Sequence, residues 1–259
     1  MIAQLREIFQ YREAVRNLVA RDLKVRYSNS ALGVVWSLFS PLLMTLVYYV
    51  VFTYLVPSGI QKFPVFIMAG LMPWTFFASS MIGTTLAISS NGQLINRVYF
   101  PREVLPLASL LANGVNFLIA LVLLFAFIAV FRIQLGLSLV WLPLIVLIQT
   151  LFSLGLGLLL SALNVYFRDT QQLVEVGTLA WFFVTPILYS IDRFSVTLKT
   201  LVQVINPMAG LVVAYRHVLY SGDSPQLELL AVTAVEAVIM LAIGALVFRR
   251  LSPSFAEEV

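Results

Sequence analysis

The chain has 259 residues, of which 61% are hydrophobic and 11% are charged, with a formal net charge of +4 and a mean hydropathy of +0.97. A water-soluble domain of this composition would expose large apolar patches, so we expect the chain in a lipid bilayer. Runs such as LVLLFAFIAVF (121–131) do not alternate between apolar and polar residues as barrel strands do. The predicted fold class is an all-α integral membrane protein.

The same composition argues against several kinds of chemistry. The chain contains no cysteine and a single histidine, His217, which leaves little material for a metal site. No recognised nucleotide-binding or hydrolase motif is present. The positive charges are spread along the chain, as in membrane proteins whose loops set topology, so no nucleic-acid partner is expected. We predict a protein that is not an enzyme and has no cofactor, metal or catalytic residue of its own.

Residues 1–31 are predicted to form a cytoplasmic amphipathic interface helix ahead of the first span. Apolar side chains recur along one stripe of this helix, while its basic side chains lie elsewhere. The pattern fits two interpretations, an anchor that faces lipid and a docking surface for a soluble partner. The stripe consists of Val15, Leu18, Val19, Leu23 and Tyr27.

The range 32–248 is predicted to hold six transmembrane helices, because apolar runs of about 20 residues match a hydrocarbon core of roughly 30 Å. An even number of spans places both termini on one side. Eleven of the sixteen Lys and Arg residues fall on that side, so both termini, including the tail 249–259, are predicted to be cytoplasmic. The predicted spans are 32–56, 64–88, 106–131, 139–163, 174–191 and 228–248.

The loop 91–105 between the second and third spans contains the unusual sequence VYFPRE. Prolines keep this polar piece from merging with the neighbouring spans. Its Val98, Tyr99 and Phe100 are expected to project from a short helical piece. They fit either a knob that enters a groove on a soluble protein or an anchor in the headgroup region.

The segment 192–227, on the opposite side of the membrane, is long for a connection and has its own apolar periodicity. Short helices that dip into the membrane before the last span fit this pattern, with Pro207 interrupting them. In the last span, Glu236 is the candidate intramembrane charge. An interhelical hydrogen bond with Ser or Thr fits Glu236 better than a proton relay, because no second intramembrane charge is visible. The sequence predicts a transport pathway without its own energy source.

Distinctive motifs follow one another along almost the whole chain, and VYFPRE (98–103) and NVYFRD (164–169) are the most specific. Together they closely resemble the transmembrane subunit of bacterial ABC-2 type polysaccharide exporters, which move O antigen, capsular polysaccharide or teichoic acid. The resembling segments are 21–52, 63–80, 96–108, 163–173, 185–190 and 205–216.

This resemblance implies a homodimer of six-span permeases in the bacterial cytoplasmic (inner) membrane. It also implies two copies of a separate cytoplasmic ABC ATPase subunit, which would hold the ATP and Mg. In the family, the N-terminal helix and the loop after the second span touch that ATPase, so both open interpretations shift toward docking. The implied function is export of a lipid-linked glycan. The alternatives are an ABC-2 exporter of a small amphiphile, such as a drug or lipid, and a proton-coupled carrier that works through Glu236.

By this resemblance, two sets of residues are expected to contact the ATPase and couple it to the permease. Arg168 and Asp169 of NVYFRD are the weaker candidates for contact with the ATPase, because a charged pair at a helix end often braces its own helix. The stronger candidates are Arg97, Val98, Tyr99, Phe100, Arg102 and Glu103.

A glycan conduit suits aromatic faces that alternate with small polar groups. Residues of the fifth predicted span fall at spacings of four, three and four, hence on one helical face, and we expect them to line a substrate channel at the dimer axis. The competing interpretation is that these aromatic rings contact lipid or mark the membrane interfaces. The fifth-span residues are Thr178, Phe182, Thr185 and Tyr189, and the first span adds Trp36, Phe39, Tyr48 and Phe52.

Overall fold

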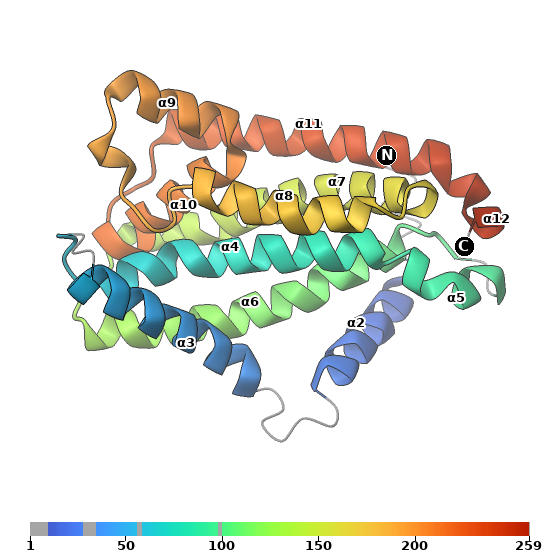
Figure 1. Cartoon of the computed structure of the whole chain (residues 1–259), viewed down its shortest axis with the longest axis horizontal. Coiled ribbons are helices and arrows are strands. Elements are labelled where there is room, and N and C mark those ends of the chain that lie inside the picture. Colours follow the sequence, from blue (N-terminus) through green and yellow to red (C-terminus); the bar gives the residue numbers. More distant parts are fainter. Residues whose placement is uncertain (1–9, 28–34, 56–58, 98–99, 259) are drawn as a thin grey trace.

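The structure is a computed structural model that describes residues 10–27, 35–55, 59–97 and 100–258. Every secondary-structure element in these ranges is a helix, and the longer helices run roughly side by side along the longest axis of the molecule (Figure 1). The predicted all-α class is confirmed.

The longer helices form the bundle and the shorter helices connect or flank them. The longer ones are α4 (Phe63–Leu86), α6 (Val104–Val130), α7 (Leu142–Tyr166, preceded by the 3₁₀ turn Leu137–Trp141) and α11 (Leu227–Leu251). The shorter ones are α2 (Arg12–Tyr27), α3 (Val35–Val50, continued by the π-helical turn Val51–Leu55), α5 (Gly92–Arg97), α8 (Thr170–Val184), α9 (Val196–Ile205), α10 (Pro207–Arg216, continued by the π-helical turn His217–Ser221) and α12 (Phe255–Glu258).

Four helices in the described part of the chain are long and apolar enough to cross a membrane. They coincide within a few residues with the second, third, fourth and sixth predicted spans. Helices α9 and α10 form a further apolar pair, bent by 112°, which agrees with the short helices expected before the last span. The four ranges are Phe63–Leu86, Val104–Val130, Leu137–Tyr166 and Leu227–Ser254.

The first and fifth predicted spans correspond to shorter helices. The apolar part of α3 and its π-helical turn, Leu42–Leu55, falls short of a full span. Helix α8 has 15 residues, which rise about 22 Å, and it ends at Val184. The prediction of one helix over 174–191 is therefore wrong. A residue that precedes proline disfavours helical backbone, and Thr185, which precedes Pro186, has φ −86° and ψ 133°.

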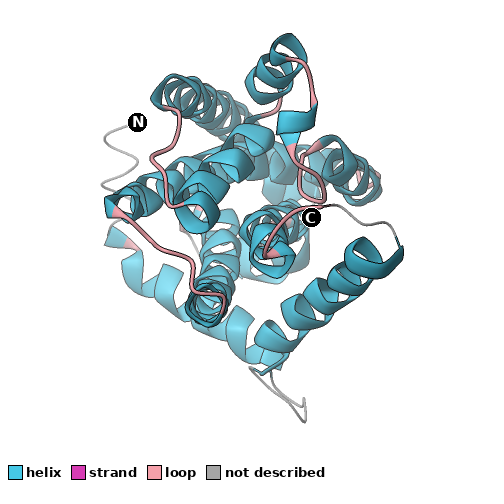
Figure 2. Ribbon diagram, turned by 90° about the vertical axis from the view of Figure 1, so that its left-hand side faces the viewer, coloured by secondary structure: helices cyan, strands magenta, loops and turns pink. Residues whose placement is uncertain are grey.

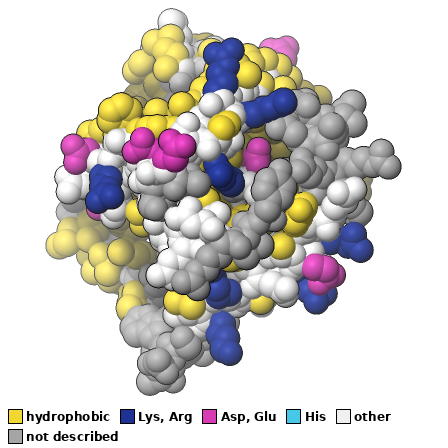
Figure 3. Space-filling view, turned by 90° about the vertical axis from the view of Figure 1, so that its right-hand side faces the viewer, with side chains coloured by type: hydrophobic (Ala, Val, Ile, Leu, Met, Phe, Trp, Pro, Cys, Tyr) yellow, Lys and Arg dark blue, Asp and Glu magenta, His cyan; other side chains and the backbone are white. Residues whose placement is uncertain are grey.

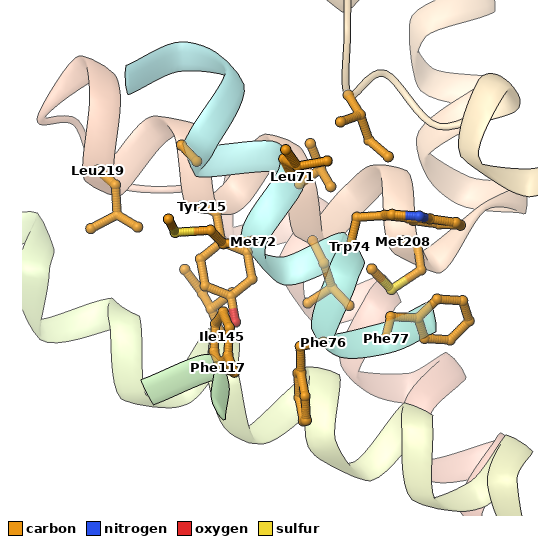
Figure 4. Close-up of a cluster of buried hydrophobic side chains, with 14 of the residues drawn as sticks. Leu71, Met72, Trp74, Phe76, Phe77, Phe117, Ile145, Met208, Tyr215 and Leu219 are labelled. Atoms are coloured by element: carbon orange, nitrogen blue, oxygen red, sulfur yellow. The ribbon is translucent and has the colours of Figure 1, made fainter. Parts of the chain in front are cut away.

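Helix α4 forms the centre of the bundle. Its most apolar window is 78% buried, whereas that of α11 is 22% buried. Helix α4 is apolar around its whole circumference and packs against α3, α6, α7, α8 and α10. Figure 4 shows part of this main cluster of buried side chains, including Trp74, Phe77, Phe117, Ile145 and Tyr215.

The outward faces of α6 and α11 expose large aliphatic side chains such as Val122 and Ile239. Water-soluble proteins rarely expose continuous surfaces of this kind, so these faces suit lipid. Helices α7 and α11 approach each other closely at Gly155 and Gly244, where an added Cβ on Gly244 would lie 1.9 Å from the Gly155 carbonyl oxygen. Small residues commonly allow such close contact between membrane helices.

The two ends of the bundle carry different elements. The α9/α10 end includes the bent helix pair and the π-helical turn His217–Ser221, and Figure 2 views it directly. At the α5/α12 end, α7 and α11 finish and α6 and α8 begin. Figure 3 shows that charged side chains of both signs lie over this second end. The described residues among those predicted to couple to an ATPase belong to the α5/α12 end.

Candidate functional site

A second hydrophobic cluster lies at the α5/α12 end, apart from the main cluster around α4. We call it the terminal cluster. It joins side chains of α5, α6, α7, α11 and α12, and Leu18 of α2 packs against it. The elements of this end are therefore held together by apolar contacts. The buried members are Ala87, Ile88, Ile95, Leu105, Leu158, Ala162, Val165, Phe248 and Phe255.

The predicted knob of the first loop is only partly described. Val98, Tyr99 and the side chain of Arg97 lie outside the described residues. Phe100 is half-buried and packs against the terminal cluster of its own chain. Phe100 is therefore held in part by apolar neighbours of its own chain, and its contact with a partner stays a prediction.

Arg102, near the end of this loop, faces the same cluster. The Arg102 guanidinium carbon lies 5.9 Å from the centroid of the Phe255 ring, within range of a cation–π contact. Glu103 occupies the N-cap position of α6, but its side chain makes no capping hydrogen bond. Neither side chain forms an ion pair with any residue that the structure describes. Arg102 is thus oriented by an aromatic ring of the C-terminal segment.

Arg168 and Asp169 occupy the connection between α7 and α8, and both are exposed. Asp169 is at the N-cap position of α8, yet its side chain caps no backbone N–H group. No ion pair between the two side chains is present in the described ranges. A local brace is therefore not what the geometry shows, and both charges are available to a partner.

A cavity of about 350 Å³ lies at this end, between the end of α4, the connection from α7 to α8, and the C-terminal residue Glu258. Asn164 donates a hydrogen bond from Nδ2 to the Ser89 hydroxyl oxygen at 3.2 Å. Its Oδ1 atom is buried and has no partner among the residues described. The cavity is lined by Leu86, Ser89, Asn164, Val165, Arg168, Gln171 and Glu258. It brings together the end of α4 with the turn that follows it, the second predicted coupling segment and the C-terminal Glu258, to which the sequence assigned no role.

The predicted N-terminal helix is present as α2. Val15 is buried, and Leu18 and Val19 are half-buried, so the apolar stripe faces the protein over this part. Helix α2 packs against α6, and Arg26 near its end donates a hydrogen bond to Asn113 Oδ1 at 2.9 Å. This contact orients α2 relative to the bundle.

The residues predicted to line a channel on α8 do not share one exposed helical face. Thr178 and Phe182 are each 9% exposed and Thr185 is fully buried. The Phe182 ring packs 5.8 Å from that of Trp74 in α4. Tyr189 lies beyond the end of α8. The predicted face is therefore turned into the protein, and the opposite face is the exposed one, with Leu173, Val176, Leu179 and Phe183.

The first-span residues that were predicted to line the channel differ from one another in their exposure. Phe39 is 38% exposed, whereas Tyr48 and Phe52 are partly buried against the main cluster. The Phe52 ring lies 5.5 Å from that of Phe63 at the start of α4. The side chain of Trp36 lies outside the described part of the chain. Among the described members of this group, Phe39 is the most exposed.

At the α9/α10 end, Arg216 is 6% exposed and donates hydrogen bonds to four backbone carbonyls. Its guanidinium carbon lies 3.6 Å from the centroid of the Phe66 ring. A Cβ on Gly70 would lie 3.0 Å from Arg216 NH2, so glycine leaves room for the cation. No carboxylate pairs with Arg216 in the part of the chain described. The acceptors are the carbonyls of Phe66, Pro186, Ile187 and Tyr189.

Two buried amides extend this polar network. Asn206 accepts a hydrogen bond from Trp181 Nε1 at 2.8 Å and donates one to Thr185 Oγ1 at 3.1 Å. Gln149 donates to the Pro73 carbonyl at 2.7 Å and accepts from the Tyr215 hydroxyl at 2.8 Å. Helices α4, α7, α8 and α10 are thus joined by directed bonds. Arg216 belongs to the segment 192–227, which was predicted to lie on the outer side, although its position within the apolar run LVVAYRHVLY was a signal that it is buried.

A cavity of about 240 Å³ opens beside Arg216. Asp192 and Lys199 form an ion pair at its edge, and the hydrogen bond from Lys199 lowers the pKa of the Asp192 carboxyl below its usual value. This ion pair is partly exposed to solvent and lies at the edge of the polar network around Arg216.

Glu236 is half-buried in α11. Its Oε2 atom has no hydrogen-bond partner among the residues described. The expected bond to a Ser or Thr of a neighbouring helix is therefore not seen at this oxygen.

The chain belongs to the ABC-2 type transporter family, whose model matches residues 13–220. The matched range includes the bundle up to the π-helical turn after α10. The match therefore includes the first coupling loop, the connection before α8 and the bent helix pair.

Relatives of known name narrow the class further. The chain is 36% identical to the O-antigen export system permease protein RfbA of Myxococcus xanthus over the whole of both chains. It is 34% identical to a protein of the same name from Klebsiella pneumoniae, over 92% of this chain and 91% of that one. The polysialic acid transport protein KpsM of Escherichia coli is 25% identical over 68% of this chain and 69% of its own.

Proposed function

We propose that the chain is the permease subunit of an ATP-driven ABC exporter that moves a lipid-linked polysaccharide across the bacterial cytoplasmic membrane. The observation that carries this proposal is the full-length similarity to an O-antigen export permease. The apolar bundle supplies the membrane part. The chain has no nucleotide-binding motif, so ATP and Mg would be held by a separate cytoplasmic ABC ATPase.

The α5/α12 end is the proposed docking face for that ATPase, of which the homodimer would bind two copies. Arg168 and Asp169 are exposed and unpaired within the described ranges, and Arg102 lies close by on the terminal cluster. Charges of both signs on such a face would steer and orient a partner more than they would add affinity.

We further propose six membrane crossings and a homodimer. The shorter helices α3 and α8 would supply the two crossings beyond the four long apolar helices, with α9 and α10 dipping into the membrane. Both α3 and α8 expose apolar side chains, including Met44 and Leu179. On the exposed side of α8, Gly177 has open space around it, which would let a second copy approach closely. A pathway between two copies would then pass Phe39 and the exposed face of α8.

Glycan export can be tested by deleting the gene and restoring it, with surface polysaccharide and its lipid-linked precursor measured by immunoblot and mass spectrometry. The proposal expects that surface glycan disappears, that the precursor accumulates inside, and that both effects depend on the partner ATPase. Normal surface glycan with loss of resistance to amphiphilic drugs would favour the small-amphiphile alternative. Transport that persists without any ATPase and fails in Glu236→Gln would favour the proton-coupled carrier.

The proposed orientation has an independent test, because the chain has no native cysteine. Val196 in α9 is 82% exposed and Phe167 before α8 is 65% exposed. A single cysteine at position 196 should react with an impermeant thiol reagent applied to intact cells, and one at position 167 should not. The opposite labelling pattern would reverse the orientation.

A further inference from the structure

The C-terminal segment Ser252–Glu258 is an integral part of the α5/α12 end. After α11 ends at Leu251, a 3₁₀ turn brings Phe255 back into the terminal cluster, where its side chain is fully buried. The Phe255 ring lies 5.3 Å from that of Phe248 and 6.3 Å from that of Tyr166. The Tyr166 hydroxyl also donates to the Leu251 carbonyl at 3.1 Å.

Phe255 touches both segments that are expected to contact the ATPase. Arg102, over its ring, belongs to the motif VYFPRE, and Tyr166, beside its ring, belongs to NVYFRD. In the described ranges, no hydrogen bond or ion pair joins residues 100–103 directly to residues 166–169. Phe255 is thus a side chain that contacts both segments.

Two further observations place α12 beside the elements that carry the coupling motifs. Helix α12 packs against both α5 and α7. Glu258, in its last turn, lines the 350 Å³ cavity together with Ser89 and Arg168. Every described contact of this short segment is thus with the end of the bundle that carries the coupling motifs.

We propose that Ser252–Glu258 is a positioning element of the ATPase-docking face, in which Phe255 fixes the two coupling segments relative to each other. They then move as one unit when the ATPase changes conformation. The terminal cluster can transmit such a movement because packed side chains shift together rather than deform continuously. This inference rests on the proposed function for the identity of the partner, although the positioning itself is a property of this chain alone.

The experiment compares Phe255→Ala with Phe152→Ala. Phe152 is an equally buried aromatic residue of α7, but it belongs to the main cluster, where it packs against Phe77 and Trp181. Both variants lose the same atoms, so both should lower thermal stability. Phe255→Leu, which keeps apolar bulk but removes the ring from Arg102, should give an intermediate result.

The first readout is the distance between spin labels on cysteines introduced at Glu103 and Phe167, measured in the full-length permease in nanodiscs. We expect one narrow distance in the otherwise unchanged protein and in Phe152→Ala, and a broad distribution in Phe255→Ala. A narrow, unshifted distance in Phe255→Ala would overturn the proposal.

The second readout uses the ATPase that copurifies with the unchanged permease. Because coupling between sites typically changes affinity about fivefold or more, we expect at least that loss of ATPase affinity for Phe255→Ala, and less than a twofold change for Phe152→Ala. Equal losses in both variants would show general destabilisation and contradict the positioning role. If the unchanged permease bound no ABC ATPase, the proposed function would fail, while the label distances would still decide whether Phe255 positions the two segments.

Discussion

The two ends of the bundle are held together by different chemistry. At the α9/α10 end, Arg216, Asn206 and Gln149 join helices and loops through buried hydrogen bonds with defined directions. At the α5/α12 end, the terminal cluster joins its elements through aliphatic and aromatic contacts around Phe248 and Phe255.

This difference matters because the two kinds of contact respond differently to change. A buried polar group that loses its partner keeps its full desolvation cost, so a hydrogen-bonded network tolerates few arrangements. Apolar contacts are less directional, and a cluster keeps much of its stability when its members are exchanged for similar volumes. The α9/α10 end is thus built for one arrangement, while the α5/α12 end can shift as a packed unit, as a face that follows a moving ATPase would require.

The largest effect is expected for Arg216→Met at the hydrogen-bonded end. The change leaves four carbonyls without their charged donor, and since each unsatisfied buried group costs about 1–3 kcal/mol, we expect a loss above about 4 kcal/mol. Thermal unfolding in detergent, followed by fluorescence-detected size exclusion, measures it. Lys199→Ala, at the partly exposed pair nearby, is the control and should change little. A stable, well-folded Arg216→Met protein would contradict the idea that the α9/α10 end tolerates substitution less than the α5/α12 end.

A smaller loss is expected for Tyr215→Phe, which removes one hydroxyl and leaves the fully buried Gln149 Oε1 without this donor. We expect a destabilisation of about 1–3 kcal/mol. The two single variants, Tyr215→Phe and Gln149→Leu, and the variant that carries both changes form a double-mutant cycle. Strictly additive effects in that cycle would show that the two side chains are not coupled.

Phe248→Leu tests the apolar end in the same assay. Phe248 is fully buried and packs on Phe255, and because leucine preserves apolar volume in part, we expect a loss of about 1.5 kcal/mol or less. Phe248→Asn is the matched polar change and should be far more damaging. If Phe248→Leu cost as much as Arg216→Met, the terminal cluster would need the same strict geometry as the polar network.

The smallest effect concerns pH at the α9/α10 end. Because Lys199 lowers the pKa of Asp192 in the folded protein, the contribution of this carboxylate is present above the pKa of an unfolded Asp and is lost as pH falls through the lower folded value. The pair is partly exposed, so the loss should be about 1 kcal/mol or less. Melting temperatures measured between neutral and acidic pH should fall slightly more for the unchanged protein than for Asp192→Asn. Identical profiles would argue against a contribution from the pair.

The positions of most helices were predictable because membrane spans and amphipathic helices depend on local patterns. The second, third, fourth and sixth predicted spans and the bent α9/α10 pair agree with the structure. The end of α8 was missed although its signal was local, since Pro186 falls inside the predicted span 174–191 and the helix ends at Val184, two residues before it. With the helix ending there, Tyr189 does not continue the helical face that Thr178 and Phe182 share.

The membrane class, the long apolar helices and the family motifs could be inferred from the amino-acid sequence, because hydrophobic length and motif spacing are properties of neighbouring residues. The roles of Arg216 and Phe255 depend instead on tertiary packing. The Arg216 side chain reaches the Phe66 carbonyl 150 positions away in the chain, and Phe255 meets Arg102 and Tyr166 from two other connections. Such contacts follow from how the helices pack, and no local pattern specifies which distant carbonyl or ring a side chain will meet.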